Sequence, residues 1–154
     1  MENKYRLLTE DELTSLEPEF IQYLASNGID ATKWEELLEE DEVTVDLHIS
    51  SFSDIVMQKS LENIEYIEHR TSNDLKLFHF GQDEAFLIAV KSQPLDLENI
   101  EFFTPEQIQQ TKLFKANKKY TRSREEELYD LLNKGCVISK GTLYKQLKQL
   151  VGNM

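Results

Sequence analysis

The first part of the chain places apolar residues at helical spacing. Thr9 and Glu12 stand three residues apart, the spacing of a capping box at the start of a helix. Gly28 follows the last apolar position and can take the left-handed conformation that ends a helix. The pattern predicts one helix from Thr9 to Asn27, whose apolar stripe is Leu13, Leu16, Phe20 and Leu24.

A second helix is predicted to begin at Asp30 or Thr32. Thr32 and Glu35 form another capping box, and the apolar residues behind it again have helical spacing. This helix runs into the acidic residues 39–42.

Residues 43–50 fit two patterns. Apolar and polar residues alternate from Val43 to Ile49, as in a strand, but Val45, Ile49, Phe52 and Val56 also form a helical stripe. No turn residue interrupts residues 42–63. We therefore predict one long helix there, with a strand over 43–50 as the alternative.

Three short segments rich in β-forming residues follow, at 64–70, 75–80 and 85–90. Turn-forming clusters at 72–74 and 81–83 separate them. Parallel strands need a long crossover, so connections this short join antiparallel strands. The pattern predicts a three-stranded antiparallel meander.

The C-terminal part is predicted to be helical. Thr104 and Gln107 form a capping box for a helix that carries the lysines of segment 112–119 toward its end. Ser123 and Ser139 are placed to cap two further helices.

The predicted fold is therefore α+β. N-terminal helices (1–63) pack on a three-stranded antiparallel meander (64–91), and a C-terminal helical subdomain (104–151) follows. A length of 154 residues is typical of one domain, so we predict a single domain over residues 1–154.

Composition narrows the class of protein. The single cysteine, Cys136, cannot form an internal disulfide, and no Cys/His spacing matches a zinc site. Residues 1–8 carry charges with no apolar stretch behind them, unlike a signal peptide, and the longest apolar run, 85–90, is too short to cross a bilayer. We expect a cytoplasmic protein without membrane contact.

Charge is distributed unevenly along the chain. The net charge is −12, yet residues 1–110 hold 7 Lys+Arg against 25 Asp+Glu, while residues 111–154 hold 10 against 4. A basic cluster of this kind suits a phosphate backbone or an acidic protein partner. The candidate contact residues are Lys112, Lys115, Lys118, Lys119, Arg122, Arg124, Lys140 and Lys145.

Two simpler interpretations of this cluster compete with a binding role. It can be a solvated face, or it can pair with the acidic part of the same chain. The last two predicted helices resemble a helix-turn-helix in outline. However, Gly141 would weaken the recognition helix by about 1 kcal/mol, which favours a plain helical hairpin.

Other candidate chemistry is sparse. The acidic stretch 35–42 lacks the spacing of a calcium-binding loop, and Cys136 follows a helix C-terminus, where the dipole disfavours a thiolate. His69 and His79 fall on neighbouring predicted strands and would form an acid–base site only around a pocket with carboxylates. No phosphate-binding loop or hydrolase motif occurs. We predict no cofactor, no metal site and no catalytic residue.

Several stretches along the chain carry a family resemblance when taken together. They are Tyr5–Thr9, Phe20 through Ile29, Phe52–Val56, Glu68–Arg70, and Ser123–Leu128 through Gly135–Ser139. With these residues the chain resembles a family of short bacterial proteins known only as a domain of unknown function. The resemblance covers nearly the whole chain and implies no activity, cofactor or site residue. It favours the helical interpretation of residues 43–63.

These observations favour a non-enzymatic intracellular binding or adaptor module. It would act through protein–protein contacts or self-association, because catalytic motifs are lacking and the charge is bipolar. The alternative is a nucleic-acid- or ribosome-associated factor that uses the basic C-terminal helices. A third hypothesis, an enzyme, requires a pocket that gathers His69 or His79 with carboxylates.

Overall fold

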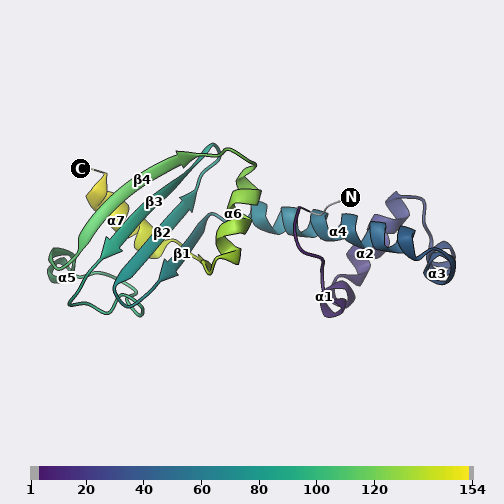
Figure 1. Cartoon of the computed structure of the whole chain (residues 1–154), viewed down its shortest axis with the longest axis horizontal. Helices are drawn as coiled ribbons and strands as arrows, with labels where there is room; N and C mark the ends of the chain where they lie inside the picture. The colour runs from purple at the N-terminus through teal and green to yellow at the C-terminus, as the bar shows by residue number, and fades with distance from the viewer. Residues whose placement is uncertain (1–3, 153–154) are drawn as a thin grey trace. The chain divides into compact units, whose positions relative to one another are not determined.

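The computed structural model describes residues 4–152 and is α+β, as predicted (Figure 1). The chain divides into two compact units, residues 1–60 and 61–154, and the boundary falls near the end of the longest helix. The first unit is helical. The second holds an antiparallel sheet of five strands.

The first unit is built from four helices. Their bounds are α1 (Glu10–Ser15), α2 (Glu17–Ser26), α3 (Ala31–Glu40) and α4 (Glu42–Glu62). Aromatic rings join three of them: Phe20 of α2 lies 5.3 Å from Trp34 of α3 and 4.9 Å from Phe52 of α4, between ring centres. The segment before α1 is tied to α4, where Ser53 Oγ accepts a hydrogen bond from the backbone N–H of Leu8 at 3.0 Å.

The capping box at Thr9 is confirmed, but the single helix predicted after it is wrong. Glu12 N donates to Thr9 Oγ1 at 3.2 Å and Thr9 N donates to Glu12 Oε1 at 2.9 Å. The helix then breaks at Leu16, and α2 begins with Pro18 in its first turn. Proline lacks an N–H and clashes with the preceding turn, so it fits the start of a helix and not its interior.

The next two helices were also predicted, the first of them with a choice of two starting residues. Asp30 is the residue that caps α3, because its carboxylate accepts from Lys33 N at 2.7 Å; the box predicted at Thr32 is not formed. The long helix predicted over residues 42–63 is confirmed as α4, so the strand alternative at 43–50 is wrong.

The second unit is a sheet with the strand order β4-β3-β2-β1-β5. The predicted meander forms its three central strands and is extended by a further strand on either side. The strands are β1 (Tyr66–Arg70), β2 (Asp74–Phe80), β3 (Glu84–Lys91), β4 (Lys112–Lys119) and β5 (Val137–Ser139). The helices are α5 (Pro105–Gln109), α6 (Arg124–Asn133) and α7 (Thr142–Val151).

The lysine-rich segment corrects the predicted C-terminal helical subdomain. The capping box at Thr104 is formed, but the helix it starts, α5, ends at Gln109, and residues 112–119 form strand β4. β4 pairs along its whole length with the edge of β3, from Glu84↔Lys119 to Lys91↔Lys112. This long-range pairing outweighs the helical propensity of the lysines.

The predicted link after α6 is also a strand. Residues 137–139 form β5, which pairs with β1, so Ser139 does not cap the last helix. Gly141 occupies that position with φ +79°, and a Cβ there would lie 2.6 Å from the ring of Tyr66. Ser123 does cap α6, since its hydroxyl accepts from Glu126 N at 3.2 Å.

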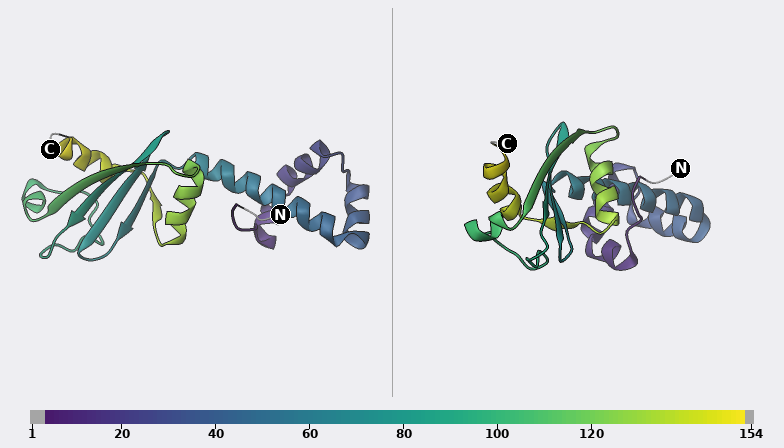
Figure 2. Two further views of the ribbon diagram at one scale, coloured as in Figure 1. Left: turned by 45° about the horizontal axis from the view of Figure 1, so that its top comes forward. Right: turned by 60° about the vertical axis from the view of Figure 1, so that its left-hand side comes forward.

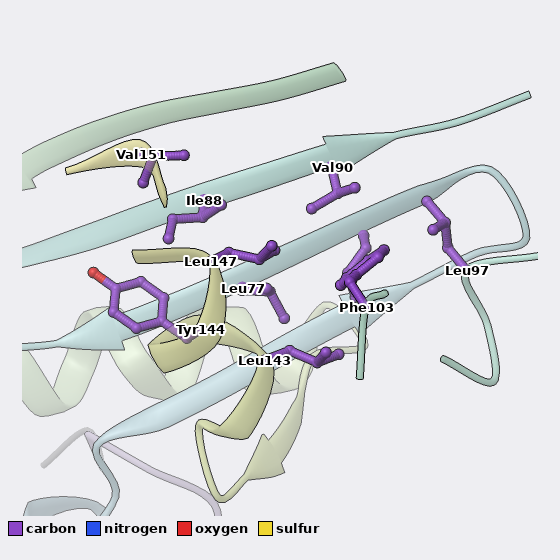
Figure 3. Close-up of a cluster of buried hydrophobic side chains, with 10 residues drawn as sticks. Leu77, Ile88, Val90, Leu97, Phe103, Leu143, Tyr144, Leu147 and Val151 are labelled. Atoms are coloured by element: carbon purple, nitrogen blue, oxygen red, sulfur yellow. The ribbon is translucent and has the colours of Figure 1, made fainter. Parts of the chain in front are cut away.

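The two long helices of this unit lie on opposite faces of the sheet (Figure 2). α7 packs on one face and buries the main core of the unit, which Figure 3 shows. The residues of this core are Leu75, Leu77, Ile88, Val90, Leu97, Phe103, Leu143, Tyr144, Leu147 and Val151. α6 lies on the other face, near one end of the strands.

Candidate binding face

The sheet face that carries α6 is only partly covered, and we call it the open face. Strand pairing determines which side chains point to it, because neighbouring residues of a strand point to opposite faces. Phe78, Leu87 and Ala116 lie in one row across β2, β3 and β4. Its other residues on these strands are Asp74, Lys76, Phe80, Ala85, Ala89, Lys91, Lys112, Phe114 and Lys118. Phe114 is 52% exposed, a large fraction for an aromatic side chain.

A pocket of about 320 Å³ lies between this face and α6. Its floor is apolar, and Leu131 supplies an apolar wall from the helix. The lining from the open face includes Phe78, Phe80, Ala85, Leu87 and Ala116. Pockets with apolar walls and a few polar groups at the rim are typical ligand sites.

Ion pairs form the rim of the pocket. Lys118 Nζ lies 2.8 Å from Glu127 Oε1, and Arg122 pairs with Asp130. Glu127 is almost fully buried, and its other oxygen accepts from Thr121 N at 2.9 Å. Burial alone would raise the pKa of Glu127, but Lys118 and the backbone N–H groups of 121 and 122 outweigh it and hold the pKa below its usual value. The rim is therefore charged and fixed in place.

Tyr120 closes the end of the pocket next to β4. Its hydroxyl donates to the carbonyl of Gly81 at 2.8 Å, and its ring stacks on Phe80 with 5.8 Å between ring centres. Burial raises the pKa of Tyr120 to about 12, so the phenol stays a neutral donor.

Three lysines gather at the far end of the open face. Lys76, Lys91 and Lys112 come from three adjacent strands and line a second hollow of about 570 Å³. Lys91 Nζ also lies 6.0 Å from the centre of the Phe114 ring, within reach of a cation–π contact. Asp74 stands opposite Lys91 in the strand register, so a carboxylate also lies at this end of the open face.

The structure distributes the predicted contact residues over two faces. Lys112 and Lys118 point to the open face, where Arg122 joins them at the pocket rim, while Lys115 and Lys119 point to the α7 side of the same strand. The remaining two lysines belong to the α7 region. Lys140 is exposed before α7, and Lys145 Nζ lies 5.1 Å from the centre of the Tyr66 ring.

Arg124 points into the protein, where its side chain holds neighbouring backbone segments together. Its guanidinium donates to the carbonyls of Leu61 at 3.2 Å and Phe80 at 3.1 Å, and also to that of Ile64. It pairs with Glu125 at 3.0 Å, and only 14% of its side chain is exposed.

Sequence reasoning missed Lys76, Lys91, Phe78 and Phe114 as site residues. A signal was present in β2, where Lys76 and Phe78 alternate with the two core leucines between Asp74 and His79. The alternation predicts which of them share a face, but it does not show that this face stays uncovered.

The two histidines do not face each other, contrary to the arrangement considered from the sequence. His79 pairs with Tyr66 on the α7 side, whereas His69 pairs with Lys76 and points to the open face. The His79 ring stacks on Tyr66 with 4.7 Å between ring centres, and its Nε2 lies 3.7 Å from Glu65. Burial lowers the pKa of His79. A shallow hollow does gather it with Glu65, Glu62 and Glu125.

Cys136 and the acidic residues were the other candidates from the sequence. Cys136 is buried, and burial raises the pKa of its thiol, which disfavours the reactive thiolate. Within residues 4–152, no group of His, Cys, Asp and Glu side chains could hold a metal ion. The first unit carries most of the net negative charge: residues 1–60 have 4 Lys+Arg against 15 Asp+Glu, while residues 61–154 have 13 against 14.

The chain belongs to a family of unknown function, DUF6495, whose family model matches residues 1–152. The resemblance to a family of unknown function that the sequence showed is thereby confirmed. No curated protein and no solved structure matches the chain. Across residues 4–152, no helix has both the length and the apolar character to span a membrane.

Proposed function

We propose that the protein is a non-enzymatic binding module that takes a segment of a partner protein on its open face. The observation that carries the proposal is the apolar pocket between the open face and α6. An aromatic or aliphatic side chain of a partner would fill it, in the way that a few buried anchor residues dominate most protein interfaces.

The surroundings of the pocket support a peptide as the occupant. β4 is an edge strand of the sheet, next to the pocket, so its outer backbone groups face away from β3. An extended peptide can bind such an edge through backbone hydrogen bonds while its side chains enter a pocket. The lysines of β4 also guard the edge against unspecific pairing with other strands. We place this activity in the cytoplasm, where a lone buried thiol such as Cys136 stays reduced.

Single-stranded nucleic acid is the second candidate. It is favoured by two aromatic side chains, Phe78 and Phe114, on a sheet face with lysines, since bases stack on such rings. The lysines, however, gather at the far end and the pocket rim, and a phosphate backbone needs cations along its whole path.

The test is selection of random peptides displayed on phage against the whole protein. The pocket variant is Ala116→Trp, which places an indole in the pocket from an exposed strand position. The matched control is Lys119→Trp on the same strand, which is also exposed but points to the other face and does not line the pocket. We expect selected peptides to carry an apolar anchor, to lose binding to Ala116→Trp and to keep binding to Lys119→Trp.

The contrary results are equally specific. Peptides that bind both variants alike would place the binding surface elsewhere. Failure to select any peptide, together with tight binding of single-stranded RNA oligonucleotides that Ala116→Trp weakens, would favour the nucleic-acid candidate.

A further inference from the structure

The three lysines at the far end of the open face form a cationic site in their own right. Lys91 and Lys112 are paired across β3 and β4, and Lys76 lies two residues from Asp74, the partner of Lys91 on β2. All three are exposed and line one hollow. Within residues 4–152, neither Lys76 nor Lys112 forms an ion pair or a hydrogen bond through its side chain. Three ammonium groups against one carboxylate attract a negative group.

Asp74 adds a second sign of a ligand at this place. Its Oδ1 is buried and has no hydrogen-bond partner among the residues that the structure describes. A buried acceptor without a donor is costly, so such atoms are rare in native proteins. Asp74 lines the hollow, so its carboxylate can turn toward a bound segment, whose backbone N–H would then supply the missing donor while an acidic side chain meets the lysines.

Strand register sets the distance between this cationic site and the pocket. The row Asp74, Lys91 and Lys112 lies four residues from the row Phe78, Leu87 and Ala116 on every one of the three strands. Four residues of extended chain span about 13 Å. A peptide lying extended along these strands would therefore reach both sites with side chains four positions apart, which point the same way.

We infer that the partner segment is acidic: it places an apolar residue in the pocket and a Glu or Asp four positions away on the lysines. This inference rests on the proposed function and names the chemistry of its ligand. The middle of the path is apolar, formed by Leu87, Ala89 and Phe114, so cationic contact is confined to the ends. That spacing fits two separate side chains of a peptide better than the evenly spaced phosphates of a nucleic acid.

The experiment uses fluorescein-labelled synthetic peptides in a Ser/Thr background, each with one Trp and two Glu residues separated by one Ser. In one peptide the nearer Glu stands four positions from the Trp and its neighbour is Ser, with the second Glu six positions away. In the matched peptide the same residues stand at five and seven positions. The shift by one turns both carboxylates to the opposite side of an extended chain. We expect the four-position peptide to bind about tenfold more tightly in fluorescence anisotropy at low salt, as two exposed ion pairs allow.

The protein variants separate specific from general charge effects. Lys76→Glu with Lys112→Glu reverses the proposed site, whereas Lys115→Glu with Lys119→Glu makes the same change in net charge on the other face. We expect the first double variant to abolish the preference for the four-position peptide. The second double variant should retain it.

The outcomes distinguish this inference from the proposed function. In one outcome, Ala116→Trp weakens the binding of Trp peptides, but neither the Glu spacing nor the double variant Lys76→Glu with Lys112→Glu changes it. That outcome would overturn the inference and leave the proposed pocket unaffected. If Ala116→Trp weakens the binding of no Trp peptide, the proposed function fails together with this inference. Tighter binding of an oligouridylate that the same lysine reversals abolish would overturn the inference in favour of nucleic acid.

Discussion

Arg124 offers the sharpest test of how the sheet unit is held together. Its guanidinium satisfies three backbone carbonyls: that of Leu61 in α4, that of Ile64 in the connection between α4 and β1, and that of Phe80 at the end of β2. We consider Arg124→Met, which keeps much of the apolar stem and removes every donor. A hydrogen bond to a charged donor contributes about 1.5–3 kcal/mol, and a carbonyl left buried without a partner costs about 1–3 kcal/mol.

Those contributions overlap, so we expect a loss of about 3–5 kcal/mol in the free energy of unfolding, the range found on removing one partner of a buried charged network. The assay is urea unfolding of the whole protein followed by the near-ultraviolet circular dichroism of its tyrosines. Hydrogen exchange should show the loss at the end of α4 and in β2, because the carbonyls of Leu61 and Phe80 lie there.

Arg122→Met is the matched control. Arg122 stands two residues away, forms one ion pair with Asp130 and is 50% exposed. Exposed ion pairs contribute little to stability, so the control should lower the free energy of unfolding far less than Arg124→Met does. If Arg124→Met were no more destabilising than Arg122→Met, the structural role of Arg124 would be refuted.

Two further predictions concern the turn before α7 and the N-terminal ion pair. Gly141→Ala should lower the stability of the protein far more than Gly28→Ala does. Both glycines have positive φ, but a Cβ at Gly141 would collide with the Tyr66 ring, whereas a Cβ at Gly28 would meet open space. Thermal unfolding of both variants measures the difference. Hydrogen bonds from Arg6 lower the pKa of Glu12 from 4.5 to about 2, so the stability this pair contributes is present above pH 4.5 and is lost as the pH falls toward 2. Carboxyl titration by NMR should give that low pKa, and Arg6→Met should return it toward 4.5; a Glu12 that titrates normally in the wild type would contradict the geometry.

The sequence predicted best where local signals decide the structure. Capping residues at Thr9, Thr104 and Ser123 mark real helix starts, because a cap depends only on residues three positions apart. The break at Pro18 was equally local and was overlooked. Helix α4 was recovered because no turn residue interrupts it.

The sequence failed where pairing between distant segments decides. β4 is a strand because β3 offers it a free edge, and β5 because β1 does, which no local pattern of three to eight residues reveals. The same failure misplaced the candidate site. Read as a helix, segment 112–119 gathers its lysines at one helical end; as a strand it sends Lys112 and Lys118 to one face and Lys115 and Lys119 to the other. The lysines of β2 and β3 join the site only through strand register.

The central claim is that the open face, and no other surface, takes the partner peptide. The most direct measurement is methyl NMR of the full chain, titrated with the four-position Trp–Glu peptide. We predict shifts at Leu87, Ala116 and Leu131, which line the pocket, with Leu143 and Leu147 of the α7 core unchanged. Shifts confined to residues around α7, or none at saturating peptide, would contradict it.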